Sequence, residues 1–133
     1  MMRLAALMVF LMRTPDLTGR TILIVEDEPL IALDIASTFE QAGAKVTTTN
    51  TLKRALLLVE HDGLSAAILD HALADGDSAL VCKRLSERAI PFVNYSGMRN
   101  IGGACSDAPS IDKPANPIVL VEKIAELLQC PVR

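Results

Sequence analysis

The feature that most constrains the fold is the alternation, from Thr21 onward, of short apolar runs with longer amphipathic stretches. The first run, residues 22–25, reads Ile-Leu-Ile-Val, a β-branched-rich segment typical of a strand that is buried on both faces. Pro29 then opens a stretch with apolar residues at helical spacing. Because this rhythm continues almost to the end of the chain, it predicts a parallel sheet with helices on both faces.

One segment interrupts the rhythm of strands and helices. We expect strands at residues 22–25, 45–49, 66–69 and 90–95 and around Ile111, and helices beginning at Pro29, Thr51, Ala79 and Pro117. Residues 97–109 contain Gly102 and Gly103, end in Pro109 and include one large aliphatic residue, Ile101. A full helix is not expected there, so the fourth helix of the series should be reduced or irregular.

Length and composition indicate one packed domain and exclude several function classes. A chain of 133 residues has room for one ordinary core. The 13 Lys and Arg residues against 16 Asp and Glu residues give a net charge of -3, which leaves no basic surplus for binding nucleic acid. The cysteines, Cys82, Cys105 and Cys130, are odd in number and form no C-x-x-C pair, so neither a disulfide framework nor a zinc site is predicted. We expect Cys82 to be a small core residue and the protein to occupy a reducing cytoplasm.

An apolar run, residues 4–12, precedes the first predicted strand. It is too short to span a bilayer, and the polar residues that follow it do not form a signal-peptide cleavage site. Two interpretations remain open: a short helix packed on the domain or on another chain, and upstream sequence that precedes a true start at Met12. We therefore expect an apolar extension at residues 1–19, a folded domain at residues 20–129 and a tail at residues 130–133.

Polar residues follow four of the predicted strands at the point where each strand ends. They are Glu26, Asp27 and Glu28 after the first strand, Asp70 after the third, Ser96 after the fourth and Lys113 after the fifth. Taken singly, each acid could be a helix cap or a solvated loop residue. Together they would meet at one edge of a parallel sheet, where carboxylates repel one another unless a cation such as Mg2+ offsets their charge. A carboxylate nucleophile, a metal, a lysine and a hydroxyl donor are the parts that phosphoryl transfer requires.

Four motifs give the sequence a resemblance to the receiver domains of two-component response regulators over residues 20–129. They are Ile-Leu-Ile-Val-Glu-Asp-Glu-Pro at 22–29, Ala-Ile-Leu-Asp at 67–70, Asn-Tyr-Ser-Gly at 94–97 and Asp-Lys-Pro at 112–114. The resemblance implies a flavodoxin-like, doubly wound α/β fold with five parallel strands in the order 2-1-3-4-5. It also implies a cis bond between Lys113 and Pro114.

The resemblance assigns a role to each matching position. Asp70 would accept a phosphoryl group from a sensor histidine kinase or a histidine phosphotransfer protein. Glu26, Asp27, Asp70 and the backbone carbonyl of Ala72 would hold Mg2+. Ser96 would bond the phosphoryl group, and Lys113 would form an ion pair with it.

Two positions depart from the family pattern and bear on how a signal is relayed. Ser110 stands three residues before Lys113, where the family often has an aromatic residue. The distance from Ser96 to Lys113, 113 minus 96 or 17 residues, is shorter than usual for the family. For His71 we weigh a metal ligand against a surface or partner-contact residue and favour the second, because alternation points it away from Asp70.

The resulting hypothesis is a stand-alone receiver that switches a downstream protein rather than an enzyme that turns over a substrate. It implies no nucleic-acid or membrane partner and leaves homodimer formation open. One alternative is a pseudo-receiver, a module of the same fold that binds proteins without being phosphorylated. The other is a Mg2+-dependent phosphatase that acts on an external substrate through Asp70.

Overall fold

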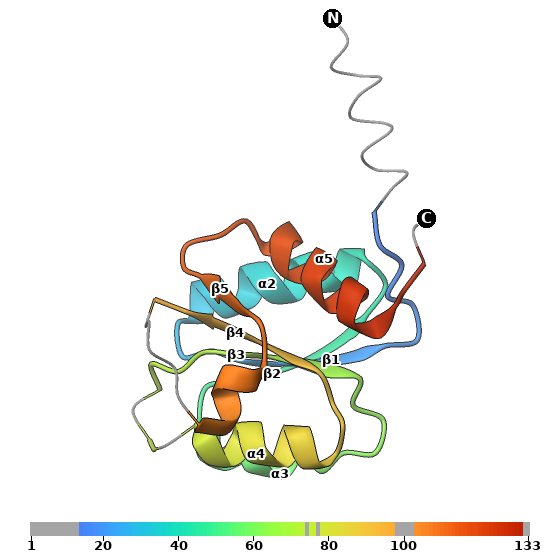
Figure 1. Cartoon of the computed structure of the whole chain (residues 1–133). Helices are drawn as coiled ribbons and strands as arrows, with labels where there is room; N and C mark the ends of the chain where they lie inside the picture. Colours follow the sequence, from blue (N-terminus) through green and yellow to red (C-terminus); the bar gives the residue numbers. More distant parts are fainter. Residues whose placement is uncertain (1–13, 74, 77, 98–102, 132–133) are drawn as a thin grey trace, which may run out of the picture.

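A computed structural model describes residues 14–73, 75–76, 78–97 and 103–131, so the apolar run at residues 4–12 lies outside the described residues. A central sheet separates two helical layers, with α2 and α5 on one face and α3 and α4 on the other (Figure 1). The two ends of the described chain meet, because the Asp16 amide donates a hydrogen bond to the Pro131 carbonyl oxygen at 2.9 Å.

The sheet has five parallel strands in the order β2-β1-β3-β4-β5, which confirms the predicted doubly wound fold. The strands are β1 (Thr21–Val25), β2 (Lys45–Thr49), β3 (Ala66–Leu69), β4 (Phe92–Ser96) and β5 (Ser110–Asp112). Val25 of β1 pairs with Leu69 of β3, so the residues that follow these two strands emerge side by side. Ser96 of β4 pairs with Asp112 of β5, which brings the start of the next loop to the same edge.

Three helices begin at the predicted residue, and α3 begins one residue later than predicted, after Thr51. The helices are α2 (Pro29–Gln41), α3 (Leu52–Leu58), α4 (Ala79–Glu87) and α5 (Pro117–Leu128). The Thr51 side chain caps α3 by accepting a hydrogen bond from the Arg54 amide at 3.2 Å, and Asn116 caps α5 by accepting from the Ile118 amide at 3.1 Å. Within the described ranges, no helix is both long enough and apolar enough to cross a membrane.

The predicted irregularity of the fourth helix is confirmed in the part that is described. Between β4 and β5 the chain forms a short 3-10 helix, η1 (Gly103–Asp107), in place of a full α-helix. Residues 98–102 lie outside the described residues.

The core consists of one aliphatic cluster on each face of the sheet. Ile24 and Phe39 belong to the cluster under α2 and α5, and Leu23 and Val81 belong to the cluster under α3 and α4. Leu17 is also fully buried in the first cluster. The packed unit therefore includes residues that precede β1.

The prediction that the cysteines form no disulfide is wrong. Cys82 of α4 and Cys105 of η1 are bonded to each other, with their Cα atoms 5.1 Å apart, and Cys130 is free. Cys82 is buried as expected, but it packs beside a cysteine that is 23 positions further along the chain. The number of cysteines and their local spacing do not reveal this pair, because it is formed by the packing of η1 on α4.

Candidate functional site

Two buried carboxylates and one exposed carboxylate meet at the carboxyl ends of β1 and β3. Glu26 follows β1 and Asp70 follows β3, and the side chain of each is only 2% exposed. Asp27 is exposed, yet it offers a carboxylate oxygen that lies within 4.8 Å of one from each of the other two acids. The structure therefore brings together the three acids that the resemblance assigns to Mg2+.

Lys113 lies between the two buried acids. Its Nζ is 2.5 Å from Glu26 Oε1 and 3.3 Å from Asp70 Oδ2, and its side chain is 20% exposed. The ammonium group also lies 5.4 Å from the centre of the Tyr95 ring, within the range of a cation–π contact. The bond between Lys113 and Pro114 is cis, as the resemblance implies.

The two oxygens of Asp70 have different surroundings. Oδ1 accepts a hydrogen bond from the Ala72 amide at 3.0 Å. Oδ2 is buried and accepts no hydrogen bond within the described part of the chain, although the Lys113 ammonium is near enough for an ion pair. A buried oxygen with spare acceptor capacity, beside two further carboxylates, fits a hard divalent cation such as Mg2+.

The environment moves the pKa values of Glu26 and Asp70 in opposite directions. Burial raises the pKa of Glu26 above its usual range, and the neighbouring Asp70 adds to this, so the hydrogen bond from Lys113 is outweighed. Burial also pushes the pKa of Asp70 upward, but the Ala72 amide and the Lys113 charge outweigh it and hold that pKa below its usual range. Asp70 is therefore the more readily ionised acid of the pair.

The pKa of Lys113 is raised for a related reason. Burial lowers it, but the hydrogen bond to Glu26 and the charges of both buried acids outweigh that effect. Lys113 is therefore a fixed cation at this edge of the sheet.

Ser96 is buried at the carboxyl end of β4, next to the strand that Asp70 follows. Its backbone carbonyl accepts a hydrogen bond from the Lys113 amide at 3.2 Å, so the two predicted site residues are joined through the main chain. Ser110 lies exposed at the start of β5, where the family often has an aromatic residue.

Tyr95 is a site residue that the sequence reasoning missed. Its hydroxyl accepts a hydrogen bond from the Ala115 amide at 3.0 Å and donates one to the Ala115 carbonyl at 3.2 Å. The buried ring thus holds the chain just after the cis bond and lies against the Lys113 ammonium. Tyr95 is the single tyrosine of the chain and directly precedes Ser96, and this position was the available signal.

The structure adds two contacts to the prediction that His71 is a surface or partner-contact residue. His71 is half-buried, with Nδ1 2.5 Å from Ser78 Oγ and Nε2 2.5 Å from Asn94 Oδ1. The imidazole therefore bridges the loop after β3 to strand β4. The alternation of a strand gives no guide to a side chain in the loop that follows the strand, so these two contacts could not be predicted from the sequence.

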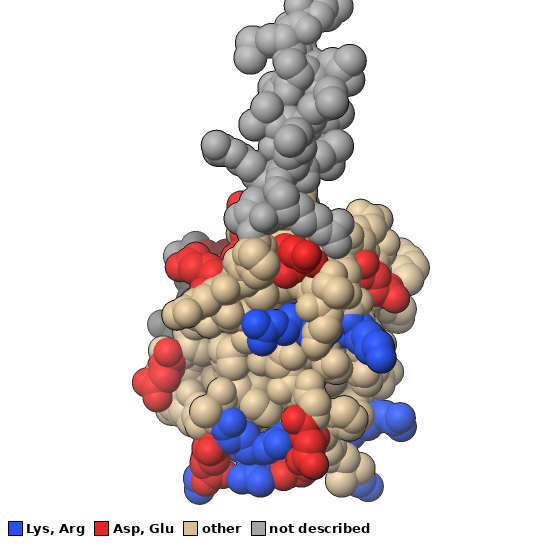
Figure 2. All heavy atoms as spheres, turned by 90° about the vertical axis from the view of Figure 1, so that its right-hand side faces the viewer, with Lys and Arg blue, Asp and Glu red and all other residues tan. Residues whose placement is uncertain are grey.

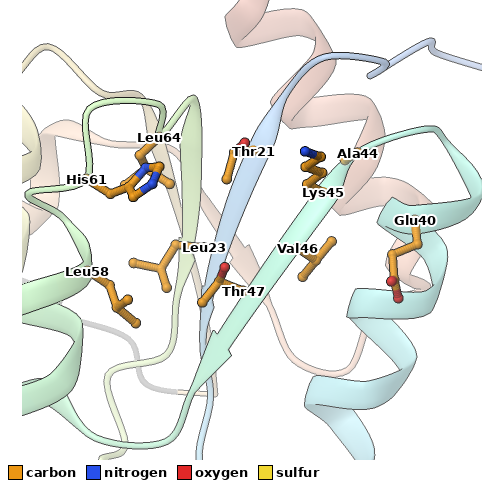
Figure 3. A pocket seen from close by; sticks show the side chains of 10 residues that line it. All are labelled: Thr21, Leu23, Glu40, Ala44, Lys45, Val46, Thr47, Leu58, His61 and Leu64. Atoms are coloured by element: carbon orange, nitrogen blue, oxygen red, sulfur yellow. The ribbon is translucent and has the colours of Figure 1, made fainter.

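Two hollows lie at opposite ends of the sheet. One, of about 670 Å³, is bordered by Glu26, Asp27, Leu33 and Arg54 and therefore opens beside the acids. The other, of about 600 Å³, is lined by residues near the amino ends of the strands, including Thr21, Lys45 and Leu64 (Figure 3). The second hollow is remote from the carboxylates and is not part of the site.

The surface drawn in Figure 2 carries Lys and Arg interspersed with Asp and Glu, and neither sign forms a continuous patch on that face. Ion pairs such as that of Arg84 with Glu60, at 2.5 Å, also occur among the exposed side chains of the described chain. That face lacks the basic stripe that nucleic-acid binding requires.

No protein-family model matches the sequence, and no curated protein matches it. Solved structures do match. A receiver domain from Methanospirillum hungatei is 28% identical, with a TM-score of 0.75, over 84% of this chain and 95% of that one. A response regulator receiver protein from Sinorhizobium medicae is 24% identical, with a TM-score of 0.74, over 84% of this chain and 95% of that one.

A third similar structure is the receiver domain of a sensor histidine kinase from Pseudomonas aeruginosa, which has a magnesium ion coordinated in its active-site cleft. It is 21% identical, with a TM-score of 0.72, over 84% of this chain and 99% of that one. Together with the strand order, these likenesses show that the chain has the fold of the response-regulator receiver domains over most of its length.

Proposed function

We propose that the chain is a phosphoacceptor of a two-component phosphorelay, in which Asp70 accepts a phosphoryl group and the modified domain controls a protein partner. The donor would be a sensor histidine kinase or a histidine phosphotransfer protein. One observation carries this proposal. Asp70 is a buried carboxylate with an oxygen that accepts no hydrogen bond from the described residues, and it lies between two acids and a lysine.

The chemistry assigns a separate task to each side chain. A carboxylate oxygen of Asp70 forms a bond to phosphorus while the bond from phosphorus to the donor's imidazole nitrogen breaks. The imidazole leaves as a neutral ring when its other nitrogen carries a hydrogen, and otherwise it takes up one proton from solvent as it leaves. The Lys113 ammonium, 3.3 Å from Asp70 Oδ2, stabilises negative charge on the transferred group. The Ser96 hydroxyl, at the end of the neighbouring strand, donates a hydrogen bond to a phosphoryl oxygen.

Glu26, Asp27 and Asp70, together with the backbone carbonyl of Ala72, would hold Mg2+. The fit rests on three carboxylate oxygens within 4.8 Å of one another and on the spare acceptor capacity of Asp70 Oδ2. When bound, Mg2+ supplies positive charge against the phosphoryl oxygens. The magnesium ion in the similar Pseudomonas receiver domain supports this assignment.

The test is incubation of the purified chain with acetyl phosphate and Mg2+, followed by intact-mass measurement. We expect the wild-type chain to gain one phosphoryl group and Asp70→Asn to gain none, since the amide keeps the size of the side chain and loses the nucleophile. Asp75→Asn is the matched control, because Asp75 lies in the same loop and caps α3 through the Leu52 amide. We expect it to be labelled like the wild type.

Labelling of Asp70→Asn to the wild-type extent would contradict the proposal. A folded wild-type chain that takes up no phosphoryl group would also contradict it and would favour the pseudo-receiver alternative.

A further inference from the structure

The buried cysteine pair lies on the same side of the sheet as Asn94 and His71, two polar residues close to Asp70 in the fold. Cys82 of α4 is fully buried and Cys105 of η1 is 2% exposed. Their Cα separation of 5.1 Å is within the range that a disulfide bridges without backbone movement. The bond encloses β4, the strand that carries Ser96.

The surroundings suit the reduced state as well as the oxidised state. Cys105 Sγ lies 3.7 Å from the Ser78 carbonyl oxygen, which is available as an acceptor when the sulfur carries a hydrogen. Disulfides that occur in reducing compartments are usually transient and redox-sensing rather than permanent. A pair that is well placed in both states has the property that such a role needs.

A chain of hydrogen bonds leads from Cys105 to His71, the residue that follows Asp70 in the sequence. Asn94 Nδ2 donates to the Cys105 carbonyl at 2.8 Å, and Asn94 Oδ1 is 2.5 Å from His71 Nε2. His71 directly follows Asp70, and Asn94 shares a face of β4 with Ser96 because the two are two residues apart. The position of η1 therefore bears on the residues beside the phosphoacceptor.

We propose that Cys82 and Cys105 form a reversible dithiol–disulfide pair, and that oxidation locks η1 onto α4 and couples the redox state to the phosphoacceptor site. The oxidant is a low-molecular-weight disulfide. One protein thiolate attacks it, forms a mixed disulfide and releases one small thiol, and the second protein thiolate then displaces the other small thiol. Two electrons pass from the cysteine pair to the small disulfide. The coupling rests on the proposed function, whereas the existence of the pair does not.

The pair itself is tested by equilibrating the full chain with mixtures of reduced and oxidised glutathione, trapping free thiols by alkylation and measuring intact mass. We expect two thiols to disappear together as the oxidised fraction rises and to return on reduction. Cys130→Ser is the matched control and should keep this behaviour, whereas Cys82→Ala should lose it. Circular dichroism checks that Cys82→Ala is folded.

Three results would overturn the pair. The first is a Cys130→Ser chain that stays reduced in every mixture, and the second is a bond that involves Cys130. The third is a reduced chain that forms no disulfide and instead binds one Zn2+ through His71 and the two thiols, which lie within 4.8 Å of one another.

The coupling is tested by amide hydrogen exchange in the oxidised and the reduced chain. We expect reduction to speed exchange at residues 94–96 and 103–112 by at least about tenfold, because the tether that restrains η1 is lost. Helix α5 is the internal control and should not change. Reversible oxidation without this change would overturn the coupling. If the exchange changes but acetyl phosphate labels neither form, the redox pair stands and the proposed function fails.

Discussion

Replacing Lys113 with methionine removes the cation that lies between two buried carboxylates. The side chains of Glu26 and Asp70 are each only 2% exposed. Water therefore cannot hydrate either carboxylate well enough to replace the lost ion pair. Breaking a buried ion pair by removing one member costs about 3 to 5 kcal/mol, and the 20% exposure of Lys113 places this case near the lower end, at about 3 kcal/mol. For a domain of this size, that lowers the melting temperature by about 12 °C.

The assay is thermal and urea unfolding at neutral pH, with Lys123→Met as the matched control. Lys123 pairs with Glu126 at 3.3 Å on the surface, where such a pair contributes less than about 1 kcal/mol. Equal losses for Lys113→Met and Lys123→Met would refute the reasoning, because the buried acids would then not depend on Lys113.

Lowering the pH should shrink the defect of Lys113→Met. In the wild type the pKa of Glu26 is raised, so its contribution to stability is complete below the unfolded value of 4.5 and is lost as the pH rises through the folded value. The pKa of Asp70 is lowered, so its contribution to stability is present above the unfolded value of 3.8 and is lost as the pH falls through the folded value.

Without Lys113 the pKa values of Glu26 and Asp70 both move upward, and the folded variant takes up protons more readily than the unfolded chain does. The stability gap to the wild type should therefore be smaller at about pH 5 than at neutral pH, and a gap that does not change would contradict these pKa directions.

Three further predictions concern the metal site, Tyr95 and the amino-terminal segment. Millimolar Mg2+ should raise the melting temperature of the wild type, by an amount equivalent to about 1.4 kcal/mol when its concentration is ten times the dissociation constant. The increase should be smaller for Asp27→Asn, and equal increases would place the metal elsewhere. Tyr95→Phe should lose about 1 to 2 kcal/mol of unfolding free energy, because the Ala115 amide and carbonyl lose their partner, and a neutral result in urea unfolding would refute this. A chain that starts at Met12 should unfold like the full chain. A chain that starts at Arg20 lacks the buried Leu17 and should lose about 2 to 3 kcal/mol of unfolding free energy. Equal stability of these two shortened chains would show that Leu17 contributes little.

The parts of the fold that the sequence predicts are those encoded by local pattern. The apolar run of β1 and the acid after it could be found because strand composition and strand ends are local signals. The pairing of Cys82 with Cys105 could not be found, because it depends on how η1 packs against α4. The contacts of His71 and Tyr95 depend in the same way on loop geometry, which side-chain periodicity does not describe.

Whether Asp70 is the phosphoacceptor is decided by locating the phosphoryl group on the chain. Borohydride reduces an acyl phosphate to an alcohol, so treatment after acetyl phosphate and Mg2+ marks the modified side chain for fragmentation mass spectrometry. We expect a mark at residue 70 alone, absent when Mg2+ is chelated. A mark at Glu26 or Asp27, or no mark on a folded chain, would contradict the assignment of Asp70 as the phosphoacceptor.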